Sequence, residues 1–156
     1  MTDRRLPDEL QKILALNEDR VTKAKRIADA IREAGSYRWV GIYDVNIPPG
    51  LVLNIAWSGP SAPAYPVFPV TKGITSRAIS ARKTVNVGDT ASDSSYLTAL
   101  DSTRAEIIVP ILDDTGDRVV GTIDVESEHL NAFDFTAQAL LEKCASVLRN
   151  FWTSGN

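Results

Sequence analysis

The sequence predicts an α+β domain, with a central antiparallel sheet of about six strands and helices from both ends of the chain on one face. Two observations predict this. Both ends carry apolar residues at helical spacing, and the middle carries short stretches in which apolar and polar residues alternate, separated by turn clusters. The 156 residues, 44% hydrophobic and 24% charged, are expected to form a single domain over 1–156.

Charge and composition exclude several classes of partner. The formal net charge is -3 and there is no long basic run, so neither nucleic acid nor a membrane is a predicted partner. We expect a cytoplasmic protein, because the start has no apolar signal segment and no stretch suits a membrane span. Cys144 is the only cysteine, which excludes an internal disulfide and a relay between two thiols of one chain. No cofactor is predicted.

The first expected element is an N-terminal helix over 7–35. Pro7 suits a first helical position, apolar residues recur at helical spacing from Leu10 to Ile31, and Gly35 suits the end. Asn17 is a point at which this segment can divide into two helices.

The sheet and its pocket are expected over 37–127. A strand at 37–45 alternates with period two and pairs with a strand at 51–58 across a Pro-Pro-Gly turn. If the aliphatic residues of the first strand face the core, Trp39 and Tyr43 lie on the opposite face of the sheet.

A second hairpin, at 105–112 and 118–126, carries three acidic residues on one face. Its β-branched residues alternate with Glu106, Asp124 and Glu126, so these acids lie opposite the core. A solvated outer face explains any single acid. Three acids on the side of the aromatic residues indicate a ligand pocket instead.

The remaining segments are expected to cover this pocket or to pack on the other face of the sheet. They are a proline-rich loop at 59–70, a short helix at 72–81, a strand at 84–87, a polar loop at 88–101 and a C-terminal helix at 134–153. Asp134 can cap the last helix, and Cys144 lies in its apolar stripe.

Several segments together resemble the GAF domain, and within it the branch that contains the free methionine-(R)-sulfoxide reductases. They are YRWVGIYDV at 37–45, WSGP at 57–60, FPVTKGITSRAI at 68–79, EIIVPI at 106–111 and VVGTIDVESEHLNAF at 119–133. The resemblance implies a central antiparallel sheet, a pocket closed by loops and a homodimer through the terminal helices.

Five residues match pocket positions of these reductases. Trp39 and Tyr43 match pocket aromatic residues, and Glu106, Asp124 and Glu126 match pocket carboxylates. The resemblance implies that these groups hold the sulfoxide end and the amino group of a free amino acid. This agrees with the face assigned to them by strand alternation.

The chain departs from the family at its cysteines. Tyr65, Thr75 and Ala99 stand where the reductases have cysteines, and none of them can attack sulfur as a thiolate. Cys144 is interpreted as a small buried apolar residue on the far side of the sheet. The reductase activity is therefore expected to be lost. Trp57 and Tyr65 are equally consistent with pocket wall and with loop packing.

The sequence favours a ligand-binding module without catalysis, whose partner is a small amine or a small molecule like an amino acid. The expected binding residues are Trp39, Tyr43, Trp57, Tyr65, Thr75, Glu106, Asp124 and Glu126. One alternative is a degenerate reductase that uses Cys144 with an external thiol, and another is a dimerisation module with a vestigial pocket. No metal site is predicted: zinc lacks ligands, and strand carboxylates lack the loop spacing usual for Ca²⁺.

Overall fold

The structure, a computed structural model, describes residues 5–97 and 101–153. In chain order its elements are α1 (Leu6–Leu14), α2 (Arg20–Gly35), β1 (Trp39–Asn46), β2 (Leu51–Ser58), β3 (Val67–Pro69), α3 (Thr75–Ala81), β4 (Val85–Val87), the short 3-10 helix η1 (Thr90–Ser92), β5 (Ala105–Leu112), β6 (Val119–Ser127) and α4 (Phe135–Thr153).

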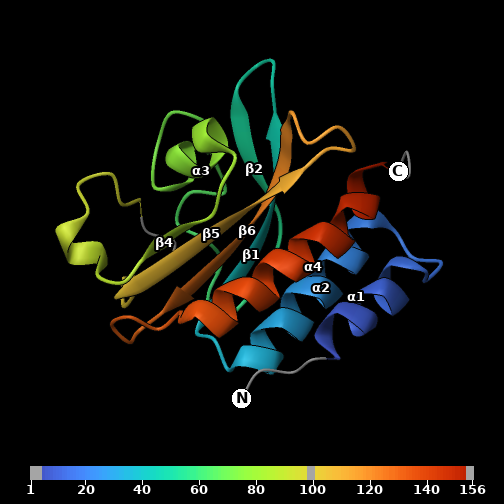
Figure 1. Ribbon diagram of the computed structural model, residues 1–156, viewed down its shortest axis with the longest axis horizontal. Helices are drawn as coiled ribbons and strands as arrows, with labels where there is room; N and C mark the ends of the chain where they lie inside the picture. The colour runs from blue at the N-terminus through green and yellow to red at the C-terminus, as the bar shows by residue number, and fades with distance from the viewer. Residues whose placement is uncertain (1–4, 98–100, 154–156) are drawn as a thin grey trace.

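The strands form one sheet of six in the order β3-β2-β1-β6-β5-β4, and every neighbouring pair is antiparallel. Four long strands occupy the centre, and the three-residue strands β3 and β4 lie at the edges (Figure 1). The predicted α+β class with helices against a central antiparallel sheet is confirmed.

One face of the sheet is covered by the terminal helices (Figure 1). Helices α2 and α4 pack on the strands, and α1 packs against both of these helices. The main core lies in this layer and includes Val40 and Ile42 of β1 together with Cys144 of α4. Within the described residues, no helix is long and apolar enough to cross a membrane.

The predicted N-terminal helix over 7–35 is two helices. The chain leaves α1 after Leu14 and restarts at Arg20, where the Asp19 carboxylate accepts a hydrogen bond from the Thr22 amide at 2.7 Å. A side-chain acceptor at this position satisfies a free amide of the new helix. A single helix over 7–35 is therefore wrong, and the chain divides around Asn17, as the sequence also allowed. Helix α4 begins as predicted, with Asp134 accepting from the Ala137 amide at 2.8 Å.

Asp44 ties this helical layer to the sheet. It is on β1, and its carboxylate accepts hydrogen bonds from the Arg20 guanidinium of α2 and, at 2.8 Å, from Trp152 Nε1 of α4. One carboxylate thus joins three elements that are distant in the sequence.

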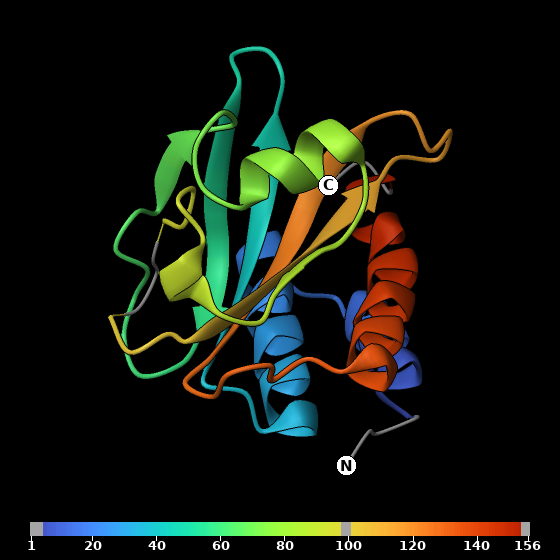
Figure 2. The same ribbon diagram turned by 60° about the vertical axis from the view of Figure 1, so that its left-hand side comes forward.

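The other face of the sheet is covered by α3 and by the loops around it (Figure 2). Trp39 and Tyr43 of β1 are buried in a second core on this side, while Val40 and Ile42 point to the helices. The two faces assigned from alternation in β1 are confirmed.

Candidate functional site

Three buried carboxylates meet on the face of the sheet that α3 covers. Glu106 of β5 lies directly across from Glu126 of β6, and Asp124 of β6 is two residues before Glu126 on the same face. Their exposed fractions are 2%, 0% and 7% for Glu106, Glu126 and Asp124. One oxygen from each carboxylate lies within 4.8 Å of the others. Alternation along two strands predicts this cluster.

The electrostatics of the cluster are unusual for carboxylates. Among the residues that the structure describes, no lysine, arginine or histidine forms an ion pair with Glu106 or Asp124. Burial raises the pKa of both groups well above the ordinary carboxyl range, and repulsion from the neighbouring acids raises it further. Glu106 and Asp124 therefore hold protons at pH values where exposed acids are ionised.

The acids differ in their hydrogen bonds. Glu126 Oε1 accepts from the Tyr96 hydroxyl at 3.3 Å and from Thr103 Oγ1 at 2.5 Å. Asp124 Oδ1 is buried and has no hydrogen-bond partner within the described residues. A buried acceptor without a donor costs free energy, and a ligand that donates a hydrogen bond removes that cost.

A small hollow lies against Glu106 and Asp124. Its volume is about 10 Å³, room for about one water molecule. Side chains from β1 and from the covering segments nearly fill the space. The lining residues are Tyr43, Tyr65, Phe68, Gly73, Ile74, Thr75, Leu97, Glu106 and Asp124.

Most of the residues expected in the pocket surround this hollow. Five of the eight line it: Tyr43, Tyr65, Thr75, Glu106 and Asp124. Glu126 lies beside Glu106 and is held by the two hydroxyls of the covering loop. Tyr65 is 49% exposed although it lines the hollow, so it lies between the hollow and solvent.

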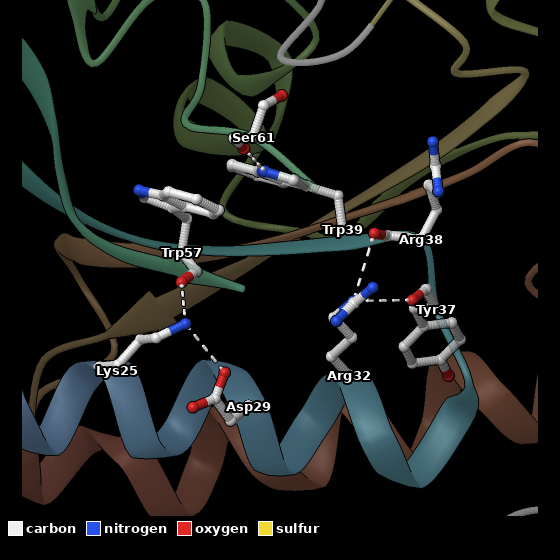
Figure 3. A network of polar contacts seen from close by, with 8 residues as sticks. All are labelled: Lys25, Asp29, Arg32, Tyr37, Arg38, Trp39, Trp57 and Ser61. Atoms are coloured by element: carbon white, nitrogen blue, oxygen red, sulfur yellow. Dashed lines mark hydrogen bonds and ion pairs between the residues drawn. The ribbon is translucent and has the colours of Figure 1, made fainter. Parts of the chain in front are cut away.

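The two tryptophans do not line the hollow. Trp39 is fully buried, and its Nε1 donates to the Ser61 carbonyl at 3.0 Å (Figure 3). A Cβ added at Gly41 or at Gly59 would come within 2.4 Å of its ring, so both glycines make room for the indole. Trp39 therefore packs against Tyr43 in the second core, with their ring centroids 6.5 Å apart.

Trp57 lies next to Trp39 in the same apolar cluster and is half-buried. The Lys25 ammonium of α2 donates to its carbonyl at 2.9 Å and lies 5.5 Å from its ring centroid (Figure 3). Trp57 thus packs against the apolar cluster and does not line the hollow, whereas Tyr65 lines it.

Several site residues were not predicted from the sequence. Tyr96 and Thr103 reach Glu126 from the loop before β5, and Phe68, Ile74 and Leu97 close the hollow. None of these residues lies in a periodic segment long enough to assign its face. The nearest signal was the polar composition of that loop.

Cys144 lies in the helical layer, on the opposite side of the sheet from the carboxylates. Its side chain is 0% exposed, and burial raises the pKa of the thiol to about 12. Of the positions that match reductase cysteines, Tyr65 and Thr75 line the hollow without a thiol, and Ala99 lies outside the described residues. A thiolate near the acids is therefore absent from the described part of the chain.

The three carboxylates are also the group that could hold a metal ion within the described residues. Carboxylate oxygens suit a hard cation such as Ca²⁺ or Mg²⁺. These carboxylates also suit an ammonium group, which is positively charged and donates hydrogen bonds to their oxygens.

Comparisons with known proteins agree on the fold. The GAF domain-containing protein A of Dictyostelium discoideum is 24% identical over 142 residues, which are 91% of this chain and 87% of that protein. No family model matches the chain.

Solved structures give the same result. The free methionine-R-sulfoxide reductase from Neisseria meningitidis, solved in complex with its substrate, has a TM-score of 0.85 and 29% identity, covering 96% of this chain and 87% of that one. A structure described as the GAF domain has a TM-score of 0.83 at 20% identity, covering 96% and 89% of the two chains. The reduced fRMsr of Staphylococcus aureus has a TM-score of 0.79 at 20% identity, covering 94% and 92%.

Proposed function

The protein has the fold of a GAF domain, and from this premise we propose that it binds a small molecule with an ammonium group, such as a free amino acid, without transforming it. The observation that carries the proposal is the buried pair Glu106 and Asp124, which has no cationic partner among the described residues.

An ammonium group matches the needs of this cluster. It offers three N–H donors and one positive charge. One donor goes to Asp124 Oδ1, the buried acceptor that has no hydrogen-bond partner within the described residues. The positive charge offsets the repulsion that raises the pKa values of Glu106 and Asp124.

The rest of the ligand lies against apolar side chains. Tyr43, Phe68 and Ile74 line the hollow next to the acids, and the ring centroids of Tyr43 and Phe68 are 5.9 Å apart. This lining favours an amine with an uncharged, partly apolar side chain over one with a second cation.

Binding requires the hollow to enlarge, because a volume of about 10 Å³ does not hold an amino acid. Tyr65 and Leu97 belong to covering segments between the strands, and Tyr65 is half-exposed. Outward movement of these two side chains gives the ligand access while the sheet that carries the acids stays in place.

Catalysis of the reductase type is not part of the proposal. The similar Neisseria protein is a free methionine-R-sulfoxide reductase solved with its substrate, which supports a free amino acid as the ligand class here. The chemistry of that protein needs a reactive thiol, and Cys144 is buried on the other side of the sheet.

Isothermal titration calorimetry against free amino acids, including methionine and methionine sulfoxide, tests the proposal. At least one compound is expected to bind, and its N-acetyl derivative, which lacks the ammonium group, is expected to fail. Asp124→Asn is expected to weaken binding by at least about tenfold, the effect of about 1.4 kcal/mol.

The matched control is Asp114→Asn, which makes the same change at an exposed turn and is expected to leave the affinity unchanged. No heat from any amino acid or small amine would contradict the proposal and favour a vestigial pocket.

We also propose that the chain forms a homodimer through its terminal helices. Val21 of α2 and Phe135 of α4 are large apolar side chains with exposed fractions of 59% and 88%, and an interface over the terminal helices would remove them from water. Light scattering tests the proposal, and a monomer at high protein concentration would contradict it.

A further inference from the structure

A groove separate from the acidic hollow lies between α4 and the outer edge of β5. Strand β4 pairs only with residues 106–108 of β5, so the edge from Val109 onward is not covered by that strand. The groove has a volume of about 410 Å³, within the usual range for sites of small ligands. It shares no lining residue with the hollow at Glu106 and Asp124.

Three cationic side chains line this groove. Arg82 and Lys83 come from the turn after α3, and Arg149 comes from α4. Among the described residues, no carboxylate forms an ion pair with any of the three. Glu142 is the acid in the lining, and it accepts a hydrogen bond from Thr84 Oγ1 at 2.6 Å. The groove is therefore positive although the chain as a whole carries -3.

Arg149 has a hydrogen-bond donor that is not used. Its Nη2 donates to the Asp113 carbonyl, which fixes the guanidinium at the groove. Its Nε is buried and has no hydrogen-bond partner within the described residues. A buried donor on a charged group is costly to leave without an acceptor. An anion in the groove supplies such an acceptor once the Arg149 side chain turns Nε toward it.

The floor of the groove is apolar. Val109 and Pro110 of β5 are buried, and they line the groove together with Leu112 and with Ala145 of α4. Pro110 has no amide hydrogen, so this edge is a poor template for an added strand. A compact ligand with an apolar part fits these features better than an extended peptide does.

We propose that this groove binds a small organic anion. Its phosphate or carboxylate group lies among Arg82, Lys83 and Arg149, and its apolar part rests on Val109 and Pro110. Arginine suits this role because its planar guanidinium matches carboxylate and phosphate oxygens. The inference is independent of the function proposed for the acidic hollow, which takes a cation.

An NMR titration of the ¹⁵N-labelled protein with phenyl phosphate tests the inference. The Arg149 Nε–H resonance, assigned by its loss in Arg149→Lys, is expected to shift and to saturate. Phenol, which lacks the charge, is expected to bind at least about tenfold more weakly, and inorganic phosphate is expected to bind more weakly because it lacks the apolar part.

Two charge reversals provide the matched comparison. Lys83→Glu is expected to weaken phenyl phosphate binding by about tenfold, because an attraction becomes a repulsion at short range. Lys12→Glu makes the same change on α1, away from the groove, and is expected to change the affinity less than about twofold. Both lysines are exposed, so both variants are expected to fold.

Three results would overturn the inference. The first is the absence of a saturable shift at Arg149. The second is that Lys83→Glu and Lys12→Glu weaken phenyl phosphate binding equally. The anion would then respond to the net charge of the protein and not to the groove. The third is that phenol or inorganic phosphate binds as tightly as phenyl phosphate does. The groove would then recognise only the apolar part or only the charged group of the ligand.

Discussion

Glu106 and Glu126 lie directly opposite each other on the neighbouring strands β5 and β6, and both are buried. Like charges at directly opposed positions destabilise a sheet. Burial strengthens the effect because little water screens the charges. Repulsion between these carboxylates therefore destabilises the folded sheet when both are ionised, and protons or a bound cation reduce it.

The first prediction concerns the pH dependence of stability. Glu106 and Asp124 have raised pKa values in the folded protein because of burial and of repulsion by neighbouring acids, so the folded state binds more protons than the unfolded state. The free energy of unfolding then falls as the pH rises from about 4 through the raised pKa values. We expect it to be lower at pH 8 than at pH 5 by roughly 1 to 3 kcal/mol, measured by urea denaturation.

Three acids with lowered pKa values do not contribute to this change in stability. Asp19, Asp93 and Asp113 have pKa values lowered by hydrogen bonds, so their contribution to stability is lost only in more acidic solution. Glu106→Gln is expected to flatten the dependence between pH 5 and 8. A dependence that is unchanged in this variant would contradict the assignment.

The second prediction is that ligand binding releases protons. A cation beside Glu106 and Asp124 favours their ionised forms and lowers their pKa values. Calorimetry in two buffers of different ionisation enthalpy is expected to give different observed heats for the same amine, with the sign of proton release. Equal heats in both buffers would show that the acids are already ionised without ligand.

The third prediction concerns Cys144, whose buried thiol has a pKa raised to about 12. A thiol reagent is expected to leave it unmodified in the folded protein and to modify it fully in denaturant. Cys144→Ala is expected to cost about 1 kcal/mol of stability, since it leaves a small cavity, and to leave amino acid binding unchanged. Rapid modification of the folded protein would contradict the placement of this residue.

The fourth prediction concerns the ring of Trp39. A Cβ at Gly41 would lie 2.4 Å from Trp39 Cη2 and 2.7 Å from Tyr43 Cε1. Gly41→Ala is therefore expected to cost roughly 1 to 3 kcal/mol, the usual effect of overpacking. In a double-mutant cycle with Trp39→Phe the two losses are expected to be less than additive. Full additivity would show that the two sites do not touch.

The fifth prediction concerns Asp44, which accepts hydrogen bonds from Arg20 and Trp152. Asp44→Asn is expected to cost about 1 to 3 kcal/mol, because it removes the charge that the partly buried guanidinium pairs with. It is also expected to change the fluorescence of Trp152. The control is Asp29→Asn, whose exposed pair with Lys25 is worth less than about 0.5 kcal/mol. Equal losses in the two variants would contradict the role of Asp44.

The sequence was most informative where residues alternate. Period two in β1 and β6 places Tyr43 and Asp124 on the face opposite the helices, because a strand has only two faces. It does not tell how far a side chain reaches. Trp39 shares that face, but its indole packs beside Tyr43 and donates to the Ser61 carbonyl instead of lining the hollow.

Contacts made by loops were beyond prediction. Thr103 lies just before β5 and donates to Glu126 of β6, and no local pattern in the sequence encodes that contact. The volume of the hollow depends in the same way on how Tyr65 and Leu97 pack. Such packing depends on distant parts of the chain, whereas alternation depends on neighbours.

The two-sided character of β6 limits how its length can change. Ile123 and Val125 belong to the apolar layer under the helices, while Asp124 and Glu126 point the other way. One inserted residue between Val120 and Ile123 would exchange the two sets and push both acids in among the aliphatic side chains. Insertions of a single residue there should be absent among folded variants of this chain, whereas the turn at residues 113–117 should accept them.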